Sequence, residues 1–114
     1  MKNEDRRIIE GIISYCRDVN KLMMEYNSDY EEYGNRISFQ YSCNMCIIQI
    51  GELVGRLSED FTSAHSDIPW HAIKAMRNLH AHNYEKVDLE IVWETLTKEI
   101  PDLKVKLEKM LEDI

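Results

Sequence analysis

The stretch Ser38–Leu57, SFQYSCNMCIIQIGELVGRL, predicts how this chain folds. Its apolar side chains recur at steps of three and four residues, which is typical of a helix with one buried face. We expect this helix to begin at Ile37 or Ser38 and to end at Leu57 or Ser58. Its buried stripe would consist of Phe39, Cys43, Cys46, Ile47, Ile50, Val54 and Leu57. Gly51 and Gly55 lie four residues apart on it, and such a pair indicates a tight helix crossing, because glycine lets another backbone approach closely.

A second long amphipathic helix is predicted before this stretch, over residues 3 to about 26. Its apolar residues follow the same helical period and are Ile8, Ile9, Ile12, Ile13, Cys16, Val19, Leu22, Met23 and Tyr26. The segment between the two helices, NSDYEEYGN over residues 27–35, is polar and ends in Gly-Asn. We interpret this segment as a connection with room for one turn of helix.

Three more helices are predicted after residues 58–68, which are rich in Ser, Asp, Thr and His and are interpreted as a loop. Pro69-Trp70 opens the first of them, with proline in the first turn, and this helix runs to about Asn83. Asp88 is a candidate N-cap for a helix from Leu89 to Ile100, whose apolar side is Ile91, Val92, Trp93, Leu96 and Ile100. Pro101 is expected to stop that helix and to open a last one, which ends near Leu111.

The composition agrees with a single all-α domain over residues 1–114, an up-and-down bundle of about five helices. The chain contains only four glycines and two prolines, and no strand-like alternation or repeat is visible. No apolar run approaches the ~20 residues of a membrane span, and the start MKNEDRRIIEG lacks a signal-peptide core. Three cysteines without framework spacing favour a reducing compartment. We therefore expect a cytoplasmic protein without a membrane partner.

The chemistry is concentrated in MRNLHAHNY, residues 76–84. Residues 65–86 hold all four histidines and carry a local charge of +1 in a chain whose net charge is −7, so this strip can accept a phosphate. On an ideal helix Arg77 and Tyr84 share a stripe about 10 Å apart with His80 between them, whereas His82 lies about 140° around from Arg77. Either the helix ends or distorts before His82, or a second chain completes the site across a two-fold axis.

Arginine and histidine are the side chains that RNA cleavage without a metal requires. A histidine can take the proton of a 2′-hydroxyl or protonate the leaving 5′-oxygen. An arginine can hold the phosphate with two parallel hydrogen bonds and offset the charge that develops. Asn78 could orient either the phosphate or the histidine.

On these residues the chain resembles the HEPN superfamily, and within it the HepT-like toxins that pair with a minimal nucleotidyltransferase antitoxin called MntA. The resemblance extends from about residue 40 to residue 101. The matching segments are Ile50-Gly51-Glu52, Ile68-Pro69-Trp70, Arg77-Asn78, His82-x-Tyr84, Val87-Asp88, Val92-Trp93 and Pro101. R-x-x-x-x-H alone is weak, but its combination with I-P-W, H-x-Y and V-W is specific. The chain departs from the family at Asn83, where an acidic or small residue is common.

The resemblance implies the toxin of a type VII-like toxin–antitoxin pair: a metal-independent endoribonuclease that needs no cofactor and whose sites form across a homodimer, with the motif helix near the two-fold axis. Arg77 and His82 would be catalytic and Asn78 would support them. It also implies that an MntA-like antitoxin transfers AMP from ATP to Tyr84 and thereby blocks RNA. Supporting candidates are His80, whose role stays open, Glu52 and Lys74.

Other interpretations of the same residues remain open. The chain could be a non-catalytic helical interaction or substrate-binding subunit of a two-component nucleotidyltransferase. Tyr84 could only pack its ring at the helix end, and Glu52 could be an ordinary solvated carboxylate. Cys43-x-x-Cys46 together with His80-x-His82 suggests zinc, but histidines two apart on a helix diverge by about 200°, so core cysteines are the better interpretation.

Overall fold

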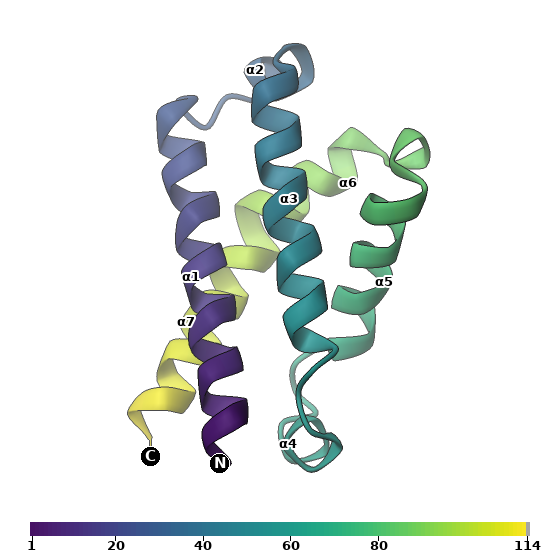
Figure 1. Ribbon diagram of the computed structural model, residues 1–114. Helices are drawn as coiled ribbons and strands as arrows, with labels where there is room; N and C mark the ends of the chain where they lie inside the picture. Colours follow the sequence, from purple (N-terminus) through teal and green to yellow (C-terminus); the bar gives the residue numbers. More distant parts are fainter. Residues whose placement is uncertain (114) are drawn as a thin grey trace.

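A computed structural model describes residues 1–113, and within them the fold is all-α, as the sequence predicts. Long helices run alternately up and down, with both ends of the chain at the same end of the molecule (Figure 1). The helices are α1 (Asn3–Glu25), α2 (Tyr30–Asn35), α3 (Ile37–Val54), α4 (Glu59–Ala64), α5 (Trp70–His82), α6 (Leu89–Glu94) and α7 (Ile100–Glu112). None of the helices in this described part is long and apolar enough to cross a membrane.

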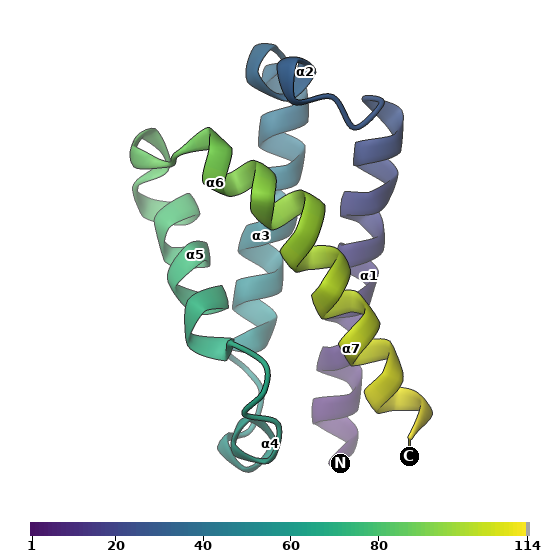
Figure 2. The ribbon, with the colours of Figure 1, turned by 180° about the vertical axis from the view of Figure 1, so that it is seen from behind.

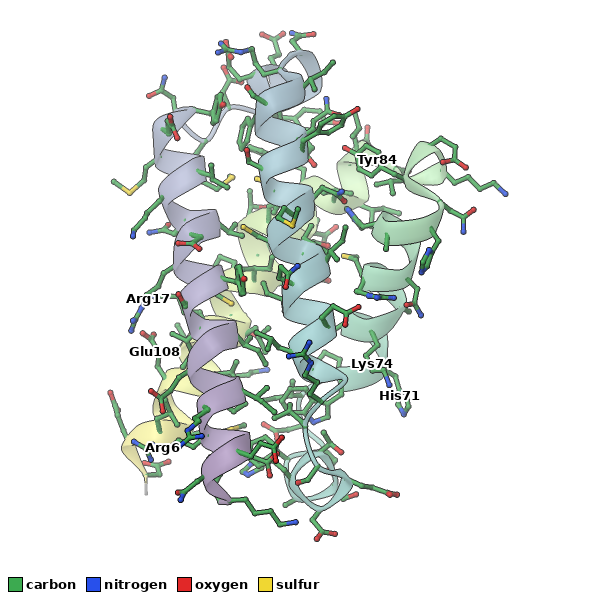
Figure 3. The ribbon with its side chains drawn as sticks, in the orientation of Figure 1. Arg6, Arg17, His71, Lys74, Tyr84 and Glu108 are labelled. Carbon is green, nitrogen blue, oxygen red and sulfur yellow. The ribbon has the colours of Figure 1, made fainter. Side chains whose placement is uncertain are left out.

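The core lies where α1, α3 and the α6–α7 segment meet, and it confirms the two predicted stripes. All seven expected residues of the α3 stripe are buried, and on α1 only Leu22 and Tyr26 remain partly exposed. Ile91 is a wrong core prediction, because 57% of its surface is exposed on the outer side of α6. At the surface, Arg17 of α1 and Glu108 of α7 form an ion pair of 2.9 Å that joins the two helices (Figure 3).

The segment predicted as a loop over residues 58–68 contains a short helix, α4, which the composition concealed. The Ser58 hydroxyl caps its first turn by accepting a hydrogen bond from the Phe61 N–H at 3.2 Å, and Phe61 is buried as its anchor. The buried carboxylate of Asp5 accepts hydrogen bonds from the N–H and hydroxyl of Ser58, and so ties this turn to α1. Trp70 then begins α5, with Pro69 at the cap position rather than in the first turn.

Pro101 does not stop a helix, contrary to the prediction. The chain passes from α6 through a single π-helical turn, Thr95–Glu99, directly into α7, and forms one diagonal rod across the back of the bundle (Figure 2). The N–H of Ile100 bonds to the carbonyl of Thr95, five residues back. Proline lacks an N–H and clashes with the carbonyl four residues before it, so the wider turn accommodates Pro101 inside the rod.

Helices α3 and α5 pack against each other at Gly51, which confirms the predicted tight crossing at that residue. A Cβ atom added to Gly51 would overlap Arg77 Cβ and lie 2.6 Å from Arg77 Cγ, whereas at Gly55 the nearest atom of α5 is Lys74 Cε at 3.9 Å. Helix α5 packs mainly against α3. Its other side borders an apolar groove of about 380 Å³ that separates it from α7. The position of α5 therefore depends on its contact with α3.

Replacing Gly51 should destabilise the fold far more than replacing Gly55. We expect Gly51→Ala to lower the free energy of unfolding by about 1–3 kcal/mol, because the new methyl group forces the two helices apart. Gly55→Ala is the matched control and should change it by less than ~1 kcal/mol, because its Cβ meets no atom of α5 closer than ordinary contact distance. Urea denaturation of both variants measures the difference, and equal effects would contradict a crossing constrained at Gly51.

Candidate functional site

Three polar pairs join α3 to the motif carried by α5 and the turn that follows it. Tyr84 is paired with Gln40, His80 with Asn44, and Arg77 with Glu52. We call these six residues the polar seam. On α3 its members are Gln40, Asn44 and Glu52, and each reaches a side chain of α5 or of the turn that follows it. The seam thus aligns four of the predicted site residues, Glu52, Arg77, His80 and Tyr84, along one helix contact.

Arg77 sits at the centre of the crossing with its guanidinium held by two neighbours. One terminal nitrogen forms an ion pair with the Glu52 carboxylate, and the other donates to the Asn78 side-chain oxygen at 2.9 Å. Each terminal nitrogen carries two hydrogens, so each keeps a donor for a further oxygen ligand. The Nε atom is buried without a hydrogen-bond partner in the described residues. Glu52 is thus a partner of Arg77 rather than a freely solvated carboxylate.

His80 is buried, with only 2% of its surface exposed, and is not available to solvent. Its Nδ1 donates to the Asn44 side-chain oxygen, which fixes the tautomer and leaves the lone pair on Nε2. Nε2 is buried without a partner among residues 1–113. Burial lowers the pKa of His80 to about 4, so the ring is neutral near pH 7. These surroundings assign His80 to holding α5 against α3.

His82 is exposed and is the last residue of α5. Because α5 is a regular α-helix from Trp70 to His82, the alternative that the helix ends or distorts before His82 is wrong. Arg77 faces α3, and His82 lies about 140° away around the same helix. Within one chain the two side chains therefore do not converge on one small ligand.

Tyr84 begins a short 3-10 turn, Tyr84–Lys86, directly after α5 (Figure 3). Its hydroxyl donates to the Gln40 side-chain oxygen at 3.2 Å, and its ring lies 6.0 Å from the Tyr41 ring and 5.9 Å from the His80 ring. Burial, with a smaller contribution from Tyr41, raises the pKa of the Tyr84 hydroxyl. The side chain is half-buried, and its hydroxyl is tied to α3 through Gln40.

A shallow pocket of about 180 Å³ opens beside Arg77 at the crossing. Its lining residues are Gly51, Glu52, Gly55, Arg56, Lys74, Arg77 and Asn78. Four of them are predicted site residues, namely Glu52, Lys74, Arg77 and Asn78. The sequence interpretation missed Arg56, and also Gln40 and Asn44 of the polar seam. No spacing signal marked Gln40 and Asn44, because the same helix also carries Ser38, Ser42 and Gln49.

The cysteines belong to the core. Cys16, Cys43 and Cys46 are free and buried, and burial raises the pKa of the Cys43 and Cys46 thiols to about 12 and about 11. Over residues 1–113 no group of three or more His, Cys, Asp and Glu side chains lies close enough together to hold a metal ion. The burial of Cys43 and Cys46 agrees with the packing interpretation of the pair.

The fold and the polar seam define a small all-α protein that presents an arginine- and histidine-bearing helix at its surface. The family model described as "Ribonuclease HepT-like" matches residues 7–110, and the chain belongs to this family. Two relatives from Methanocaldococcus jannaschii carry the name "Putative RNase". Each is 32% identical over 99% of this chain, covering 96% and 92% of its own length. A Thermococcus cleftensis protein named "Probable ribonuclease HepT" is 34% identical over 70% of this chain and 81% of its own. No solved structure matches the chain significantly.

The burial of His80 predicts a pH dependence of stability. Its folded pKa of about 4 lies below the ordinary value of 6.5, so the unfolded chain binds more protons between these values and stability is lost as pH falls through that window. Two and a half pKa units correspond to about 3 kcal/mol. Urea denaturation at pH 6.5 and pH 4 should show this loss in the wild type and a smaller one in His80→Gln. His82→Gln is the matched control and should keep the wild-type loss, because its ring is exposed; an unchanged loss in His80→Gln would contradict the assignment.

Proposed function

We propose that this protein is a metal-independent endoribonuclease and the toxin of a toxin–antitoxin pair. In the proposed reaction the 2′-hydroxyl of RNA attacks the adjacent phosphorus, the bond to the 5′-oxygen breaks, and a 2′,3′-cyclic phosphate forms. His82 either takes the hydroxyl proton while water protonates the leaving 5′-oxygen, or it protonates that oxygen while water takes the hydroxyl proton. Arg77 offsets the negative charge on the phosphate oxygens as it develops, and Asn78 helps to orient the guanidinium.

The observation that carries this proposal is the guanidinium of Arg77, held by Glu52 and Asn78 at the mouth of an open pocket in a chain of the HepT-like ribonuclease family. A positively charged fork held in one orientation suits a tetrahedral phosphate oxyanion, because little reorganisation is needed when charge develops. Glu52 is a positioning residue in this scheme, since it acts through Arg77. Lys74 adds positive charge to the same pocket.

We propose further that the site forms between two copies of the chain, with α5 near a two-fold axis. Arg77 and His82 point in different directions on one regular helix, so a second chain is the direct way to bring an arginine and an imidazole together. The outer face of α3 supports this arrangement. Ile37, Tyr41 and Met45 follow one another at four-residue steps there and are 64%, 58% and 56% exposed. A row of large exposed apolar side chains beside α5 is typical of an interaction surface.

Regulation by modification of Tyr84 is the second part of the proposal. An MntA-like nucleotidyltransferase would bind ATP, the Tyr84 oxygen would form a bond to the α-phosphorus, and pyrophosphate would leave while the partner accepts the phenol proton. The half-buried hydroxyl must release Gln40 to react, and its long hydrogen bond of 3.2 Å makes that release easy. The added AMP places negative charge and bulk next to the seam, where RNA would be repelled.

A non-catalytic role as the helical subunit of a two-component nucleotidyltransferase is the alternative function. The exposed apolar row on α3 favours it equally well, because such a row fits a protein partner of either kind. The two functions differ in RNA cleavage by the isolated protein.

Removal of either proposed catalytic group should abolish cleavage without unfolding the protein. We expect Arg77→Ala and His82→Ala to reduce the rate of RNA cleavage at least ~100-fold and to relieve growth arrest when the protein is expressed alone. His71→Ala, another exposed histidine on α5, is the matched control and should keep the wild-type rate. Gel assays with purified proteins in EDTA measure the effect, and unchanged cleavage in both variants would reject the ribonuclease.

Mixing the two inactive variants tests whether sites are shared between subunits. Refolded together, Arg77→Ala and His82→Ala chains form mixed dimers in which one site has both groups, so about a quarter of the wild-type activity should return if Arg77 and His82 come from different chains. A mixture that stays inactive would contradict a shared site while leaving the single-variant result intact.

Modification should depend on the Tyr84 hydroxyl. Incubation with the nucleotidyltransferase and ATP, followed by mass spectrometry of the peptide that contains Tyr84, should detect AMP on the wild type and none on Tyr84→Phe. Tyr41→Phe removes the neighbouring, more exposed hydroxyl and is the control that should remain modified. AMP on Tyr84→Phe would assign the acceptor elsewhere.

A further inference from the structure

The pocket beside Arg77 holds more positive charge than the motif alone requires. Arg56, Lys74 and Arg77 all line it, and Glu52 is its single carboxylate. Glu52 lies four residues before Arg56 on the same chain but pairs with Arg77 instead. Among residues 1–113, neither Arg56 nor Lys74 forms an ion pair, and both are exposed. Two cations are therefore available to a ligand in a chain whose net charge is −7.

The form of the pocket limits what that ligand is. Gly51 and Gly55 form part of its wall, and while the stem of Arg77 covers Gly51, Gly55 leaves open space between Arg77 and the other two cations. Pockets that enclose drug-sized ligands measure roughly 300–1,000 Å³. A hollow of about 180 Å³ is too small for a whole nucleotide but accepts a single anionic group such as a phosphate.

The position of the pocket along α5 favours the phosphate of an RNA backbone over the phosphate of a nucleotide that modifies Tyr84. Lys74 lies one helical turn before Arg77 on α5, so a phosphate held by Lys74 and Arg56 would be next to one held by Arg77. Helix α5 continues for eight residues after Lys74, about 12 Å along its axis, and Tyr84 lies in the turn beyond its end. Figure 3 shows Lys74 near the lower end of α5 and Tyr84 beyond its upper end. A nucleotide that modifies Tyr84 would therefore meet the chain far from this pocket, whereas RNA bound at Arg77 would pass over it.

We propose that Arg56 and Lys74 form a subsite for a non-scissile phosphate of the RNA backbone, adjacent to the phosphate that Arg77 holds. This inference rests on the proposed ribonuclease function and adds the direction in which the strand leaves the reacting phosphate. Phosphate contacts of this kind fix the register of a nucleic acid without reading its bases. The subsite thus positions RNA of any sequence next to Arg77.

The test measures binding separately from cleavage. The probe is a fluorescein-labelled single-stranded RNA with 2′-O-methyl groups throughout, which cannot cleave because the attacking hydroxyl is blocked. Fluorescence anisotropy at several KCl concentrations should show that Arg56→Gln and Lys74→Gln each weaken binding about 3–10-fold and reduce the slope of log Kd against log salt by about 0.7. The double variant should reduce the slope by about 1.4. Lys109→Gln removes an exposed lysine of α7 and should leave both quantities unchanged.

One further variant and three possible outcomes complete the test. Arg56→Lys keeps the charge and should retain binding within about twofold, which separates loss of a phosphate contact from a change in the fold. If Arg56→Gln and Lys74→Gln behave like Lys109→Gln while the wild type binds and cleaves RNA, the subsite is wrong and the ribonuclease stands. If the same variants lose affinity for ATP but not for RNA, the pocket serves a nucleotide and the inference is overturned. If the wild type neither binds nor cleaves RNA, the proposed function and the subsite both fall.

Discussion

The close approach of two helix backbones at Gly51 is the constraint on which the rest of this structure depends. A glycine at that point lets the stem of Arg77 lie directly on α3. Helix α5 itself contributes few buried residues, since only Trp70 and His80 are buried on it. The apolar groove lined by α3, α5 and α7 leaves α5 dependent mainly on its contact with α3. The crossing at Gly51 is the closest point of that contact and thus positions the motif helix.

The polar seam converts this approach into a defined orientation. Hydrophobic packing is not directional, whereas the pairs Arg77–Glu52, His80–Asn44 and Tyr84–Gln40 each fix a side chain as well as a distance. Among residues 1–113, three buried side-chain polar atoms lack a hydrogen-bond partner, and two of them, Arg77 Nε and His80 Nε2, lie on this contact, while the third is the Tyr33 hydroxyl of α2. Unsatisfied buried polar atoms are costly in general, so two of them on one helix agree with a site shaped for function rather than for stability alone.

Periodicity predicted most of the fold because the stripes of α1 and α3 are long and regular. The start of α6 also followed from sequence, since Asp88 accepts the N–H of Glu90 at 2.9 Å as an N-cap should. Two features were out of reach for physical reasons. Helix α4 depends on the burial of Phe61 and on Asp5 from the distant N-terminus, and the passage through Pro101 depends on a π turn that no local rule announces. The partners of His80 and Tyr84 were missed because a helix crossing is set by the register of two elements, which the spacing within either one does not contain.

The pairing of Gln40, Asn44 and Glu52 with residues of the motif has an evolutionary consequence. An insertion or deletion of one residue between these positions of α3 would rotate the side chains beyond it by about 100° and separate at least one pair. The spacing of the three positions on α3 therefore has to match the spacing of their partners. Substitutions face a similar coupling. A relative that replaces His80 with an apolar residue leaves the Asn44 amide unpaired, so selection should change both together. The two helices are expected to diverge as one unit, even though the fifteen residues 55–69 separate them in the chain.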